Sequence, residues 1–271
     1  MGRFDEDTAV EGGGGRYRAT LSRSWEVWGP NGGYVAAIAL RAAGAEARIK
    51  RPAAFAAHYL SVARFAPVDL SVTVVHRGRR SESLRVSMTQ DGRPVLEAIV
   101  RTATELDGLA HDVAEAPAVP DPAELRSSDE LYRRERPRFW ENVETRPVDP
   151  AAWADGRPSR PPVLRQWYRL RPASSFDDSF LEAARALLLI DTLVWPASCQ
   201  RHVDPAFIAP NLDVVAWFHR SAADSAWLLG DACTPVAEGG LLGGTVRIWS
   251  EERRLLATGG AQLLCIPPSG Y

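Results

Sequence analysis

The sequence contains SLRVSMTQDGRPVLEA at Ser83–Ala98 and a parallel stretch, GTVRIWSEERRLLAT, at Gly244–Thr258. Both stretches consist of an alternating apolar and polar run, a charged turn and a second apolar run. Such alternation predicts half-buried strands, and Asp91-Gly92 is a hairpin signal between them. An internal duplication is the simplest explanation of the parallel, so we expect two copies of one structural unit.

The segments around these hairpins follow the same order in both halves: one strand, one helix and then a run of strands. One amphipathic helix across a curved antiparallel sheet, present twice, is an α+β architecture. The first half predicts a strand near Arg16–Leu21, a helix at Asn31–Ala45 and strands at Phe55–Val62, Asp69–Arg77, Ser83–Thr89 and Pro94–Thr102; the second half predicts a strand at Val163–Arg171, a helix at Asp177–Trp195 and strands near Asn211–Arg220, Ser225–Thr234, Leu242–Ser250 and Leu255–Cys265.

A segment rich in proline and charged residues separates the two halves. We therefore expect three parts, an N-terminal repeat at 1–106, a connector at 107–162 and a C-terminal repeat at 163–271. A connector of this length without regular structure would be unusual, which predicts a short helix around Ser128–Glu141 and packing by Phe139 and Trp140.

The composition is that of an ordinary globular protein, with 45% hydrophobic residues, 24% charged residues and a net charge of −2. The chain has no compact run of basic residues that would indicate nucleic-acid binding. The three cysteines lack metal-site spacing, and the N-terminus lacks a signal-peptide pattern, so we expect reduced thiols and a cytoplasmic protein. The most apolar stretch, Leu181–Ala197, contains Arg185 and Asp191 and is too short for membrane insertion. Gly12–Gly15 is expected to be a flexible entry to the first repeat.

Three motifs resemble the tandem hotdog proteins of the type II acyl-CoA thioesterase-like family. They are WEVWGPNGGYVAA at Trp25–Ala37, NLDVVAWFHR at Asn211–Arg220 and the last strand at Leu255–Leu264. The resemblance implies a double hotdog fold, with each antiparallel sheet wrapped around a central helix. It also implies hydrolysis of an acyl-CoA to free acid and CoA without a metal or other cofactor, and assembly into a homo-oligomer, a dimer or larger.

The same resemblance implies a catalytic set of Asp, Thr and Gln that orients a water molecule. The family Asp falls on Asp191. The family Thr falls on Asn211, which is a departure from the pattern. The family Gln falls on Ala261 in an ungapped alignment, with Gln262 next to it. Because neighbouring strand residues point to opposite faces, this offset decides whether an amide enters the site.

Asp191 is also a candidate from its chemistry. On a helix it shares a face with Leu187, Leu188, Val194 and Trp195, so burial should raise its pKa and leave a carboxylate able to polarise water. The alternative is a buried aspartate that is satisfied by a hydroxyl, a backbone donor or an arginine.

The sequence Asn31-Gly32-Gly33 predicts a helix start that could stabilise the negative charge of a reacting carbonyl oxygen. Free N–H groups from Gly32 to Tyr34 and the helix dipole suit this task, and glycines let a ligand approach closely. The alternative is a capped helix start whose glycines only permit tight packing. We expect Asn31, Gly32, Gly33, Tyr34 and Tyr59 to bind substrate.

We therefore expect an acyl-CoA thioesterase in which Asp191 orients water and Asn211 and Gln262 hold it. The alternative is a non-catalytic acyl or acyl-CoA binding protein that has kept the fold. Signatures of serine hydrolases, phosphate-binding loops, dinucleotide-binding folds and zinc proteases are absent. Hydratases of this fold place a histidine five residues after the aspartate, where this chain has Pro196.

Overall fold

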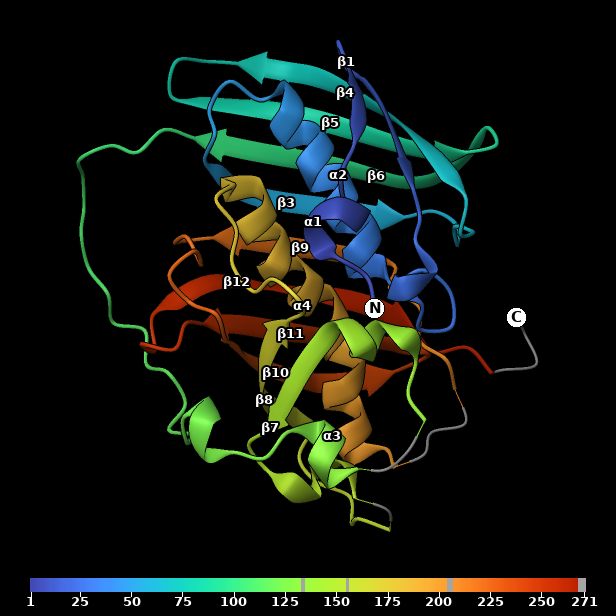
Figure 1. Ribbon diagram of the computed structural model, residues 1–271, viewed down its shortest axis with the longest axis vertical. Helices are drawn as coiled ribbons and strands as arrows, with labels where there is room; N and C mark the ends of the chain where they lie inside the picture. Colours follow the sequence, from blue (N-terminus) through green and yellow to red (C-terminus); the bar gives the residue numbers. More distant parts are fainter. Residues whose placement is uncertain (133–134, 155, 204–206, 268–271) are drawn as a thin grey trace.

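The computed structural model describes residues 1–271 except 133–134, 155, 204–206 and 268–271. Its described strands form one antiparallel sheet of twelve strands, in the order β1-β2-β4-β5-β6-β3-β9-β12-β11-β10-β8-β7, and two long helices lie on one face of it (Figure 1). The strands are β1 (Glu11–Gly13), β2 (Arg16–Thr20), β3 (Pro52–Tyr59), β4 (Pro67–Arg77), β5 (Ser81–Gln90), β6 (Arg93–Ala103), β7 (Val143–Pro147), β8 (Val163–Leu170), β9 (Asp213–Phe218), β10 (Leu228–Glu238), β11 (Leu241–Trp249) and β12 (Leu255–Leu264); the α-helices are α1 (Phe4–Asp7), α2 (Gly32–Glu46), α3 (Ser128–Leu131) and α4 (Ser179–Arg201).

Two equivalent units meet at the centre of the sheet. Strand β3 of the first unit pairs antiparallel with β9 of the second, with Ala57 opposite Val214 and Ala54 opposite Trp217. Each unit wraps its strands around one helix, α2 in the first and α4 in the second (Figure 1). The expected α+β double hotdog fold is thereby confirmed.

The two helices pack directly on each other, and glycines of α2 lie at the contact. In α2, Ala36, Ala37 and Ala39 are fully buried. A Cβ added to Gly33 would lie 2.8 Å from the carbonyl oxygen of Leu188 on α4. Only glycine fits at this crossing, which fixes the N-terminus of α2 against the middle of α4.

Helix α4 continues beyond its expected end at Trp195. It passes through Pro196 and ends at Arg201. Proline removes one helical N–H donor, but the buried apolar face of α4 offsets that loss. Arg160 also supports the last turn by donating its backbone N–H to the carbonyl of Gln200, at 2.9 Å.

The glycine-rich N-terminus is ordered, so the expectation of a flexible entry at Gly12–Gly15 is wrong. Strands β1 and β2 form a hairpin whose turn uses the positive φ angles of Gly14 (60°) and Gly15 (78°). The backbone N–H of Gly15 donates to Glu46 at the end of α2, at 2.6 Å. The hairpin is therefore anchored to the first helix.

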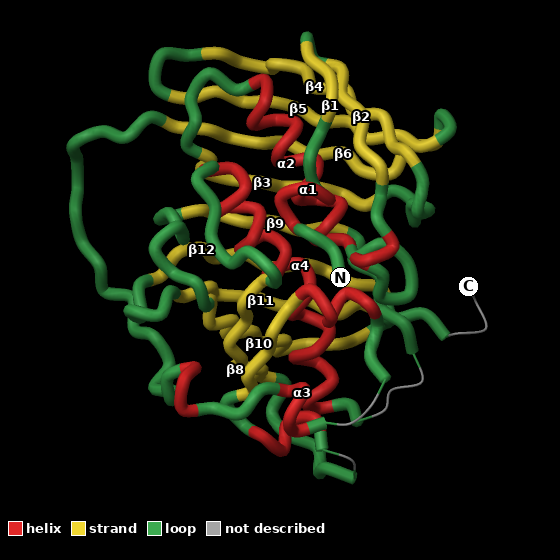
Figure 2. Tube along the Cα trace, viewed as in Figure 1, coloured by secondary structure: helices red, strands yellow, loops and turns green. Residues whose placement is uncertain are grey.

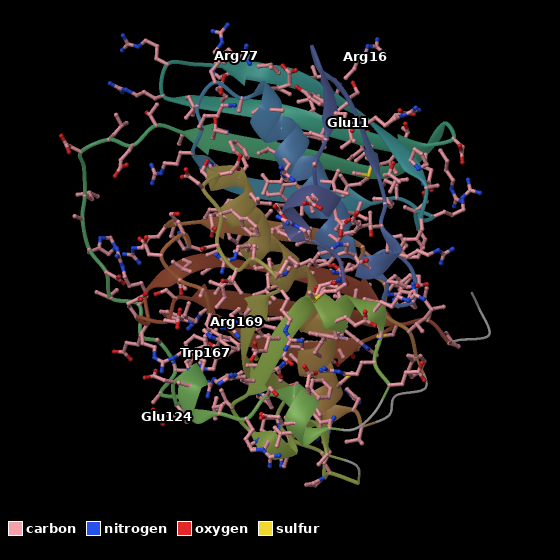
Figure 3. The ribbon with its side chains drawn as sticks, in the orientation of Figure 1. Glu11, Arg16, Arg77, Glu124, Trp167 and Arg169 are labelled. Atoms are coloured by element: carbon pink, nitrogen blue, oxygen red, sulfur yellow. The ribbon has the colours of Figure 1, made fainter. Side chains whose placement is uncertain are left out.

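The connector leaves β6 as a long loop and descends along one side of the molecule (Figure 2). Its residues pack on both faces of the part of the sheet that belongs to the second unit. Its first part covers the outer face, where the indole N–H of Trp167 donates to the carbonyl of Pro120 at 3.0 Å. Figure 3 shows Trp167 together with Glu124 on this side. Its second part contains the short helix α3 and, as expected, buries Phe139 and part of Trp140. Strand β7 then extends the sheet beside β8.

Within the described residues, no helix combines the length and the apolar character needed to cross a membrane. Helix α4 is long enough but carries the buried ion pair of Arg185 and Glu182, at 2.6 Å.

The helix crossing generates a stability prediction. We expect Gly33→Ala to lower the free energy of unfolding by about 1–3 kcal/mol, because its methyl group collides with backbone atoms of α4. This loss should exceed the gain in helix propensity. Chemical denaturation measures it. Gly13→Ala, whose added Cβ would meet nothing within 4 Å, is the control, and equal stability of both variants would contradict the crossing.

Candidate active site

A cavity of about 640 Å³ lies where the two repeats and the connector meet. One end of the cavity, near Trp28 and Leu60, is exposed, and the other end, on β8, is buried. Asp191 lies in its wall. The polar lining includes Asn31 and Tyr59 of the first repeat, Gln166, Tyr168, Asp191, Thr192 and Asn211 of the second repeat, and Ser128, Tyr132, Glu135, Arg136 and Thr145 of the connector.

Asp191 is held by side chains from both repeats. Its Oδ1 accepts hydrogen bonds from the hydroxyl of Tyr59 and from Nδ2 of Asn211, both at 2.7 Å. Nδ2 of Asn211 also donates to the backbone carbonyl of Asp191 at 2.9 Å. The amide of Asn211 thus fixes the carboxylate and the helix backbone together.

Burial governs the protonation of Asp191 and Tyr59. Asp191 is only 4% exposed. Loss of solvation raises its pKa to about 6, against the opposing effect of hydrogen bonds from Tyr59, Asn211 and the backbone of Gly33. Burial and the nearby carboxylate raise the pKa of Tyr59 well above its ordinary value, so the phenol stays protonated and donates. Asp191 can therefore exchange a proton near neutral pH.

The N-terminus of α2 points at the same carboxylate. A Cβ on Gly32 would lie 2.9 Å from Oδ2 of Asp191, so the backbone approaches the carboxylate closely. Asn31 caps the helix by accepting from the N–H of Tyr34 at 2.9 Å, and its Nδ2 donates to Thr192 at 3.1 Å. Among the described residues, no acceptor is found for the N–H of Gly32, which leaves it available to a ligand.

The structure brings five expected residues to the site: Asn31, Gly32, Tyr59, Asp191 and Asn211 line the cavity. The start of α2 fits both interpretations in part. Asn31 caps the helix, and the N–H of Gly32 remains available to a ligand.

Tyr34 lies elsewhere, and Gly33 packs against α4 behind the cavity wall. The ring of Tyr34 is fully buried and stacks on Trp25 at 5.4 Å between centroids, and its hydroxyl donates to the carbonyl of Asp7 at 2.7 Å. Its backbone N–H is occupied by Asn31. Tyr34 is thus a core residue, and its side chain does not line the cavity.

Gln262 is not brought to the carboxylate. Its side chain is on the exposed face of β12 and is not part of the cavity lining, whereas Ala261 points inward and is 7% exposed. Its backbone N–H donates to Asp213 at 2.9 Å. The strand alternation therefore leaves no glutamine amide from β12 beside Asp191.

The buried end of the cavity was not predicted from the sequence. Ser128, Thr145 and Trp153 come from the connector, and Gln166 and Tyr168 come from β8. The alternation of β8, in which Gln166 lies on the same face as apolar neighbours, is the signal that could have found one of them.

No cluster of three or more His, Cys, Asp or Glu side chains in the described parts of the chain is arranged to hold a metal ion.

The contacts of Asp191 generate a titration prediction. We expect Tyr59→Phe to raise the pKa of Asp191 further above about 6, because it removes a hydrogen bond that favours the charged form. Carbon-13 NMR of the labelled carboxyl group follows the titration. Tyr17→Phe, which removes a phenol bound to Glu46, is the matched control. An unchanged Asp191 titration in Tyr59→Phe would contradict the geometry.

Solved structures of similar proteins share this fold over nearly the whole chain. A putative thioesterase II from Thermobifida fusca is 25% identical with a TM-score of 0.82, and the match covers 98% of each chain. An acyl-CoA thioesterase II from Mycobacterium marinum is 24% identical with a TM-score of 0.81, covering 99% of this chain and 100% of that one. A hot dog fold protein of unknown function from Alicyclobacillus acidocaldarius is 22% identical with a TM-score of 0.84, covering 98% of each chain.

Two family models match consecutive parts of the sequence. Residues 21–103 match the acyl-CoA thioesterase N-terminal domain. Residues 113–266 match the acyl-CoA thioesterase C-terminal domain, which therefore includes much of the connector. By fold and by both matches, the chain belongs to the acyl-CoA thioesterase family.

Proposed function

We propose that the cavity hydrolyses an acyl-CoA thioester with a water molecule oriented by Asp191. The observation that carries the proposal is a buried carboxylate with a pKa of about 6 beside the available N–H of a helix start. A general base whose pKa lies near the working pH is effective, and N–H groups stabilise a developing oxyanion.

The reaction begins when the Asp191 carboxylate accepts a proton from water as the water oxygen bonds to the thioester carbon. The carbonyl oxygen becomes negative and accepts a hydrogen bond from the N–H of Gly32. Collapse of this intermediate breaks the carbon–sulfur bond. The proton held by Asp191 then passes to the CoA thiolate, which leaves free acid, CoA and the starting carboxylate.

Asn211 and Tyr59 position the base in this mechanism. Both donate to Oδ1 of Asp191, and the backbone of Gly33 is a further hydrogen-bond donor to the carboxylate. An asparagine supplies the donor that the carboxylate needs, so the change from the family threonine is compatible with catalysis. Gln262 has no part in it.

The rival function is acyl-CoA binding without hydrolysis. A binding cavity for an apolar chain gains nothing from a buried carboxylate, since burial of that group costs free energy. The retention of Asp191, Tyr59 and Asn211 as one hydrogen-bonded set supports the enzyme.

We also propose a division into repeats at 1–106 and 163–271 with a connector between them, and a cytoplasmic homo-oligomer. Cys233 and Cys265 are free thiols, which suits a reducing compartment. The exposed Trp217 and Ile99 on the outer face of the sheet support self-association, which sedimentation velocity can test.

The mechanism generates an activity prediction. We expect Asp191→Ala to lower kcat for acyl-CoA hydrolysis at least about 100-fold, because it removes the base. Asn211→Ala should lower kcat less, about tenfold or more, because the base remains but is less well held. Release of CoA is measured with a colorimetric thiol reagent over short, long and aryl acyl-CoAs.

The control is Gln262→Ala, which changes an exposed amide on the adjacent strand and should keep full activity. Full activity in folded Asp191→Ala would rule out the assigned base. Binding of acyl-CoA without any CoA release by the wild type would favour the rival function.

A pH prediction follows from the same carboxylate. The base acts only when deprotonated, so kcat/KM should rise about tenfold per pH unit well below about 6 and level off above it. The contribution of this carboxyl group to the free energy of unfolding should instead fall as pH rises. Because folding raises this pKa, the protonated carboxyl stabilises the fold at low pH, and that contribution is lost as pH rises to about 6. A rate independent of pH between 4 and 7 would contradict the assignment.

A further inference from the structure

The buried end of the cavity is polar, although aromatic side chains line the way to it. The walls include Trp140, Trp153 and Trp195. At the end, β8 presents Gln166 and Tyr168, which are only 4% and 2% exposed. An alkyl chain that filled this cavity would meet these polar groups at its far end.

The amide of Gln166 has a defined orientation. Nε1 of Trp153 lies 3.3 Å from Oε1 of Gln166, and an indole N–H can only donate, so the atom that it contacts is the amide oxygen. Within the described part of the chain, no hydrogen bond from Nε2 of Gln166 is found, and the residue lines the cavity. A donor in a cavity wall that has no protein acceptor can bind a ligand atom that accepts from it.

A second donor lines the same cavity. Thr145 stands opposite Tyr168 in the pairing of β7 with β8, and its hydroxyl donates to Oγ of Ser128 at 2.8 Å. Ser128 and Thr145 are each 2% exposed, and both line the cavity. Because Oγ of Ser128 accepts from Thr145, its own hydrogen is left to donate.

Helix α4 gives the distance between this end and the base. Asp191 and Cys199 both line the cavity, and eight residues of helix separate them by about 12 Å. Arg157 donates to the carbonyls of Cys199 and Gln200 and stacks on the ring of Trp153 at 5.8 Å. Trp153 and Gln166 line the same cavity as Cys199. An extended chain advances roughly 1.2 Å per bond, so about ten bonds reach the level of Cys199.

We propose that the preferred acyl group is of medium length and carries a hydroxyl or keto oxygen near its distal end, which accepts a hydrogen bond from Nε2 of Gln166. Ser128 supplies a second donor at the same end. The inference rests on the proposed thioesterase function and adds its substrate class. A site that provides buried donors discriminates against a substrate that leaves them unpaired.

The competing explanation is an ordered water molecule at this end of the cavity. Water often satisfies buried polar groups, and a purely alkyl substrate would then be accepted as well as an oxygenated one. The two explanations differ in whether an oxygen at the distal end of the substrate raises kcat/KM.

The test compares 10-hydroxydecanoyl-CoA, decanoyl-CoA and 3-hydroxydecanoyl-CoA by CoA release. For the wild type we expect kcat/KM for 10-hydroxydecanoyl-CoA to exceed that for decanoyl-CoA three- to tenfold, with no gain for the 3-hydroxy compound. Gln166→Leu should abolish or reverse the preference. Gln166→Glu, which keeps the shape but replaces the donor by an acceptor, should abolish it too and covers the case in which Gln166→Leu does not fold.

The matched control is Gln262→Leu, the same substitution on the exposed face of β12, which should keep the preference. Equal rates with decanoyl-CoA and 10-hydroxydecanoyl-CoA, or a preference that survives in folded Gln166 variants, would overturn the proposal in favour of bound water.

Calorimetric binding of the same compounds to Asp191→Asn separates this proposal from the proposed function. Tighter binding of the distal hydroxyl compound that depends on Gln166, without hydrolysis by the wild type, would support the substrate class and refute the thioesterase. Hydrolysis by the wild type without that binding preference would support the thioesterase and refute the substrate class.

Discussion

The close crossing of α2 and α4 is the constraint on which the site depends. Gly33 allows the first turn of α2 to rest on the backbone of Leu188, one turn before Asp191. Any side chain there would separate the helices and withdraw the Gly32 N–H from the carboxylate. The crossing thus joins two halves of the chain into one site, with a helix start from one repeat and a buried carboxylate from the other.

This arrangement explains how a duplicated fold came to hold a single site of this kind. Only the first central helix begins with two glycines, and only the second carries an acid at its middle. Tyr59 from β3 and Asn211 before β9 then approach the carboxylate from opposite repeats. The antiparallel pairing of β3 with β9 keeps these two donors in register across the junction. Each repeat alone would lack part of the set.

Much of the fold could be predicted because its signals are local. Alternation in Ser83–Ala98 and the glycine-led start of α2 each depend on a few neighbouring residues. Asp191 could be predicted for the same reason, from its place on an apolar helix face. Gln262 could not be placed, because a one-residue offset reverses a strand side chain and no local signal fixes that register.

Other features depend on contacts between distant segments. The path of α4 through Pro196 follows from tertiary burial, which outweighs the local rule that proline ends a helix. Tyr34 could not be assigned to the core from sequence, because its partners Trp25 and Asp7 lie outside its helix. The connector became part of the cavity wall only through its packing beside β8, a contact that the composition of 107–162 does not encode locally.

The central claim is that Asp191 activates water and does not itself attack the thioester. Hydrolysis of an acyl-CoA in ¹⁸O-labelled water under single-turnover conditions, followed by mass spectrometry of the free acid and of the peptide that contains Asp191, tests it most directly. We expect the label in the released acid, no label in the Asp191 carboxyl group and no acyl adduct on the Asp191 peptide, because a mixed anhydride that is hydrolysed at its acyl carbon would also give labelled acid. Label in the Asp191 peptide would show a covalent acyl-enzyme, and no release of labelled acid at all would show that this site is not a thioesterase.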